Sequence, residues 1–68
     1  MTIVEFELSV FIKHVGTNRN AFANSIDRSH QIVDLWVQKG DVFVDANIDT
    51  WDVTRVYRRA TEKVLWEK

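Results

Sequence analysis

The chain has 68 residues, a formal net charge of −1, and neither cysteine nor proline. A chain of this length makes one small domain that buries only about 60% of its unfolded surface, so its core is marginal and a second subunit is an expected source of buried area. Without cysteine the chain forms no disulfide bonds, and a net charge near zero argues against a protein that coats DNA nonspecifically. The sequence contains no apolar run or signal-peptide pattern that would direct the chain to a membrane.

The first predicted element is a strand over residues 2–8. Apolar residues alternate there with Glu5 and Glu7, which is the period of a half-buried strand, although a helix that begins near Glu5 fits almost as well. Ser9 is placed to cap a short helix, and Gly16 is placed to close it in the left-handed conformation.

A second helix is predicted to begin after Thr17 or Asn18, either of which can serve as its N-cap. Phe22, Ala23 and Ile26 share one face of this helix. The pattern breaks in the next three residues, which predicts a turn.

Residues 29–38 predict a third helix with Ser29 as its N-cap. At about 100° per residue, one arc of this helix is wholly apolar and is expected in the core: Ile32, Val33, Trp36 and Val37. The opposite arc carries side chains that form hydrogen bonds, together with one leucine: His30, Gln31, Asp34, Leu35 and Gln38. One half of the helix therefore packs, and the other is free to contact a partner.

After Gly40 the period changes to alternation, which predicts two strands joined by a polar connection at residues 47–50. In the first strand the residues on one side are Val42, Val44 and Ala46. In the second strand Val53, Arg55 and Tyr57 alternate with Thr54, Val56 and Arg58. The tail, residues 61–68, is expected to dock on the core or on a partner subunit, or to extend a strand or a helix.

Together these elements predict a single α+β domain over residues 1–68. It has three short helices, including a helix-turn-helix, and a small antiparallel sheet built from the N-terminal strand and the C-terminal hairpin. Charge is distributed unevenly along it. Residues 13–40 carry a surplus of two bases, whereas residues 41–54 contain four aspartates and no base.

Residues 22–40 resemble the helix-turn-helix of the phage Cro repressor family. The matching residues are Ala23 where two helices cross, Ile26 before the turn, and then Ser29, Gln31, Val33 and Trp36. The sequence departs from the family at Asp27, where the family usually has a left-handed glycine; aspartate tolerates that conformation better than most residues. The order of the elements extends the resemblance to about residues 2–58.

The resemblance implies a sequence-specific double-stranded DNA-binding transcriptional repressor of phage type, working in the cytoplasm of a bacterial host. As a homodimer it would present two helices to successive major grooves about 34 Å apart, on a roughly palindromic operator. An activator would use the same contacts. The residues expected to contact the DNA backbone are Arg19, Asn20, Arg28, Ser29 and Lys39. The dimer interface, formed by pairing of the last strands, would include Val53, Arg55, Val56, Tyr57 and Trp66.

The predicted base contacts each have a chemical partner in the major groove. Gln31 can make paired hydrogen bonds to adenine, His30 can donate to guanine, and Leu35 can contact a thymine methyl group. Asp34 can accept a hydrogen bond from cytosine N4, but phosphates repel its carboxylate unless it finds that cytosine or a neighbouring arginine.

Two other functions stay open. An excisionase or another winged-helix protein would contact DNA through Arg55 or residues 47–50, although the acidic hairpin argues against this. A small protein–protein adaptor would instead bind through the hairpin edge or exposed aromatic side chains. The residues do not favour an enzyme, a metal site, a cofactor or a small-molecule ligand, since His14 and His30 lie far apart and the two glycines form no phosphate-binding loop.

Overall fold

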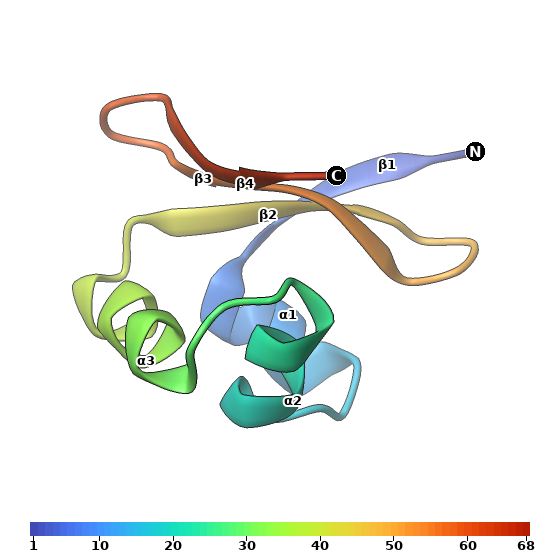
Figure 1. The fold of residues 1–68 in the computed structure, drawn as a ribbon. Helices are drawn as coiled ribbons and strands as arrows, with labels where there is room; N and C mark the ends of the chain where they lie inside the picture. The colour runs from blue at the N-terminus through green and yellow to red at the C-terminus, as the bar shows by residue number, and fades with distance from the viewer.

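The computed structural model describes all 68 residues and places three helices against one face of a four-stranded antiparallel sheet (Figure 1). The elements in chain order are β1 (Ile3–Glu7), α1 (Leu8–His14), α2 (Arg19–Ser25), α3 (His30–Lys39), β2 (Val42–Asn47), β3 (Asp52–Arg58) and β4 (Lys63–Glu67). The strands lie in the order β1-β2-β3-β4. The predicted α+β class, with three helices, an N-terminal strand and a hairpin, is confirmed. None of the helices is long and apolar enough to span a bilayer.

The end of α1 is closed by Gly16, as the sequence predicts. Gly16 has a φ of 72°, and the N–H of Thr17 after it donates to the Ile12 carbonyl at 3.1 Å. This left-handed closure satisfies a carbonyl that the helix end would otherwise leave unpaired. The prediction that Ser9 caps α1 is wrong, because the N-cap position is Glu7, two residues earlier, and the Ser9 hydroxyl donates to the Glu7 carboxylate at 2.8 Å.

The ends of α2 are also set by local hydrogen bonds. Asn18 is its N-cap, with Oδ1 accepting from the Ala21 N–H at 2.8 Å. After the helix, Asp27 has a φ of 56°, so it occupies the left-handed region that the turn was predicted to require. The Arg28 N–H then donates to the Ala23 carbonyl at 2.9 Å, which closes the helix in the same way as α1.

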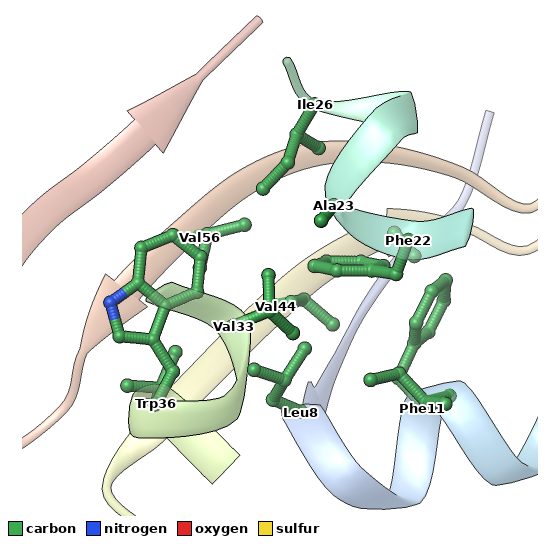
Figure 2. Close-up of a cluster of buried hydrophobic side chains, with 12 residues drawn as sticks. Leu8, Phe11, Phe22, Ala23, Ile26, Val33, Trp36, Val44 and Val56 are labelled. Carbon is green, nitrogen blue, oxygen red and sulfur yellow. The ribbon is translucent and has the colours of Figure 1, made fainter. Parts of the chain in front are cut away.

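The three helices and the sheet share one hydrophobic core, part of which is drawn in Figure 2. Its twelve residues are Leu8, Phe11, Ile12, Phe22, Ala23, Ile26, Val33, Trp36, Val42, Val44, Ala46 and Val56. Val33 and Trp36 of α3 are buried as predicted, but Ile32 keeps 38% of its surface exposed. Ile32 lies at the margin of the apolar arc, about 70° from its centre, so the side of α3 that meets the core does not reach it.

The predicted alternation holds along β2 and fails along β3. The register of the β2–β3 pair shifts by one residue at Thr54, whose hydroxyl donates to the Asp45 carbonyl at 3.2 Å. A bulge of this kind interrupts the alternation of side chains between the two faces. Val53 and Val56 therefore both pack against the core, whereas strict alternation predicted opposite faces for them.

The tail forms a fourth strand, β4, that the sequence did not predict, and Leu65 and Trp66 of this strand pack against the core, which was one of the predicted alternatives for the tail. It pairs with β3 from Arg58 opposite Lys63 to Arg55 opposite Glu67. The edge of β3 that was predicted to join two subunits is therefore covered by the chain's own tail, and Val56 is fully buried within one protomer. The free edges of the sheet are β1 and β4.

Candidate nucleic-acid interface

Helices α2 and α3 pack against each other and form the predicted helix-turn-helix. Ala23 of α2 and Ile26, the residue that follows this helix, face the same core as Val33 of α3, and Ala23 has no exposed surface, as the crossing of two helices requires (Figure 2). The Ser29 hydroxyl accepts from the Ile32 N–H at 3.3 Å, so Ser29 is the N-cap of α3. At the other end Gly40, with a φ of 76°, closes the helix.

The opposite side of α3 carries the predicted base-contacting residues, and all of them reach the surface. We call this side the exposed face of α3, formed by His30, Gln31, Asp34, Leu35 and Gln38. Leu35 keeps 53% of its surface exposed, and the Asp34 side chain keeps 47%. A large exposed aliphatic side chain among hydrogen-bonding groups suits contact with base edges, which present both polar atoms and methyl groups.

Arg19 is brought to this face from the start of α2. Its Nη1 donates to Asp34 Oδ1 at 3.2 Å, and both side chains are about half exposed. Asp34 Oδ2 has no hydrogen-bond partner. Arg19 also lines one open hollow with Gln31 and Leu35. Asp34, which is predicted to contact a base, and Arg19, which is predicted to contact the DNA backbone, therefore form one ion pair.

The other residues predicted to contact the DNA backbone are all exposed: Asn20, Arg28, Ser29 and Lys39. Arg28 Nη1 donates to the Asp27 carbonyl at 3.1 Å, which holds its guanidinium beside the turn. Neither Arg28 nor Lys39 forms an ion pair, so both charges are available to a phosphate. The Ser29 oxygen accepts from the backbone, which leaves its hydroxyl hydrogen free to donate.

The two arginines of β3, Arg55 and Arg58, form ion pairs within their own chain. Arg55 pairs with Asp45 at 2.9 Å and lies over the Tyr57 ring, 4.5 Å from its centroid. Arg58 pairs with Asp41 at 2.9 Å. The predicted interface residues Arg55 and Tyr57 therefore contact each other within one protomer, and Tyr57 is only 8% exposed. A winged-helix use of Arg55 would first have to break its ion pair.

The face of the sheet opposite the helices carries an aromatic cluster that the sequence did not reveal. The rings of Phe43 and Tyr57 stack at 6.4 Å, and Arg59 lies 5.0 Å from the centroid of Phe43. Arg59 also pairs with Glu5 of β1 at 3.3 Å. Each ring is thus covered by an arginine of its own chain.

No group of three or more metal-binding side chains occurs in the chain. In comparisons with known proteins, the chain matches no protein-family model, no curated protein and no solved structure.

Proposed function

We propose that this protein binds double-stranded DNA in a sequence-specific manner and acts as a phage-type transcriptional repressor in a bacterial cytoplasm. The observation that supports the proposal is that one side of α3 is buried and the other side is exposed. Val33 and Trp36 fix one side in the core, while the hydrogen-bonding side chains lie along the other. A helix of this kind fits the major groove, where base edges can be distinguished by their donors and acceptors.

The first turn of α3 supplies the strongest base contacts in this proposal. Gln31 offers a donor and an acceptor for adenine, and His30 offers a donor for guanine. Both are exposed and lie next to the N-cap Ser29. Leu35, one turn further on, contacts a thymine methyl group. Arg28 and Lys39 hold the phosphates on either side and fix the orientation of the helix.

A palindromic operator requires two copies of α3 in one assembly. Because β4 covers the edge of β3, we propose that two protomers pair through the free edge of β4. The backbone of β4 is paired with a neighbouring strand on one side only, and Val64 of β4 keeps 44% of its surface exposed. Trp66 packs against the core of its own protomer, so its part in such an interface is to hold β4 in place.

Selection of bound duplexes from a random pool tests the proposal, and a two-fold symmetric consensus is the expected result. The selected duplex is then titrated with His30→Ala, Gln31→Ala and a control, Thr61→Ala, at an exposed site in the β3–β4 turn. Gln31→Ala should bind about 5- to 150-fold more weakly, because a bidentate contact contributes about 1–3 kcal/mol of discrimination, and His30→Ala should also bind more weakly because it loses a single donor. Unchanged affinity in both variants would contradict the proposal.

A protein–protein adaptor is the second candidate, because β1 and β4 both present free edges to which an extended segment could add a strand. The two functions make opposite predictions for the same variants. An adaptor would keep its partner affinity when His30 and Gln31 are replaced by alanine, whereas the repressor would lose operator affinity in the same variants.

A further inference from the structure

The ion pair between Arg19 and Asp34 joins the start of α2 to the exposed face of α3. Arg19 Nη1 donates to Asp34 Oδ1 at 3.2 Å, and Asp34 Oδ2 has no partner. Resting on the proposed DNA binding, we propose that Arg19 is a positioning residue for Asp34 and not an independent phosphate contact. It holds the carboxylate so that Oδ2 accepts a hydrogen bond from the N4 amino group of a cytosine in the major groove.

The first argument is electrostatic. A lone carboxylate on the exposed face of α3 would be repelled by the phosphates of both strands, and its desolvation in the groove would oppose binding. The Arg19 guanidinium offsets that charge at 3.2 Å. The pair as a whole is neutral, so it releases no net counterion from the DNA, in contrast to Arg28 and Lys39, which have no carboxylate partner.

The second argument is geometric. Arg19 follows the N-cap Asn18, whose side chain accepts from the Ala21 N–H at 2.8 Å and so fixes the first turn of α2. Asp34 lies on α3 next to the fully buried Val33, so its backbone position is set by the core. Both ends of the ion pair are therefore held by structured elements, which limits the directions that Oδ2 can take.

The third argument is the position of Gln31. It lies three residues before Asp34, on the same side of α3, and it lines the same hollow as Arg19. The two side chains would contact neighbouring positions of one half-site, with adenine chosen by Gln31 and cytosine chosen by Asp34. Arg19 then determines specificity at a base that it does not itself touch.

The test compares Arg19→Ala with a matched control, Arg28→Ala, on the duplex selected by the unaltered protein and on duplexes with each base replaced at the cytosine position. Arg19→Ala should reduce the preference for cytosine about 10-fold, and because it leaves the Asp34 carboxylate without a counter-charge it should also weaken binding to every duplex. Arg28→Ala should weaken binding to every duplex alike and lower the salt slope by about one per protomer. Arg19→Lys, which keeps the charge and a donor, should retain most of the preference.

A double-mutant cycle separates a positioning role from a structural one. Asp34→Ala should abolish the cytosine preference, and in that background Arg19→Ala should change it no further. The inference is overturned if Arg19→Ala weakens all duplexes equally and so leaves the preference for cytosine unchanged, or if the consensus lacks a cytosine dependent on Asp34. In either case the unaltered protein still selects a symmetric site. Failure to select any duplex would instead contradict the proposed function itself, and the inference with it.

Discussion

The backbone N–H of Arg28 donates to the carbonyl of Ala23 at 2.9 Å and so closes α2 before the turn. Within this closure Asp27, the residue before Arg28, has a φ of 56°. Most residues with a Cβ are strained there by about 1–2 kcal/mol, aspartate less than most, and glycine is not strained. The turn between α2 and α3 thus includes a residue whose backbone strain lowers the free energy of unfolding.

Asp27→Gly should therefore stabilise the protein. We expect the free energy of unfolding to rise by about 1 kcal/mol, because relief of the strain exceeds the extra chain entropy of glycine. The measurement is thermal unfolding, with an expected rise in Tm of about 4–8 °C for a domain of this size. Asp27→Ala is the control and should not be stabilising; a less stable glycine variant would show that the Asp27 side chain contributes more than the strain costs.

Val33 and Ile32 are neighbours on α3 with different burial, and their alanine variants should differ accordingly. Val33 has no exposed surface, whereas Ile32 is 38% exposed. Val33→Ala should lower the free energy of unfolding by about 2 kcal/mol, because it leaves a cavity between α3 and the sheet. Ile32→Ala should cost about 0.5 kcal/mol or less. Urea unfolding of the two variants measures both values, and equal losses would place Ile32 in the core after all.

Leu35 should distinguish thymine from uracil in the selected duplex. Replacing the contacted thymine by deoxyuridine removes only the methyl group, and burial of one such group is worth about 0.8 kcal/mol, or roughly fourfold in affinity. Leu35→Ala should bind both duplexes equally. Fluorescence titration of the two proteins on the two duplexes completes the comparison, and a methyl preference that survives in the alanine variant would assign the contact to another side chain.

Val64 should control dimerisation without affecting the folded protomer. It is 44% exposed on β4, and a charge at this position opposes pairing of one β4 edge with another. Val64→Lys should shift sedimentation toward the monomer and weaken operator binding, while Tm at low protein concentration stays within about 2 °C of the original. Thr61→Ala serves as the exposed control. An unchanged association constant for Val64→Lys would place the dimer interface elsewhere.

Local chemistry in the sequence was sufficient to predict the helices and the two sides of α3. The N-caps at Asn18 and Ser29 and the left-handed closure at Gly16 depend on residues within one turn of each other, whereas the left-handed conformation of Asp27 was expected only from the resemblance to the Cro family. The apolar arc of α3 is likewise a property of a short stretch of chain. These features follow from contacts at short sequence separation, so the residues alone specify them.

Other features were decided only when distant parts of the chain came together. Arg19 and Asp34 are 15 residues apart, and no local pattern pairs them. The bulge at Thr54 reversed the faces along β3, and the tail covered the edge that the sequence had assigned to a partner. The ion pair, the bulge and the position of the tail each depend on how the helices pack against the sheet. That packing is a property of the whole core, whereas a helix cap or an apolar arc needs only its immediate neighbours in the chain.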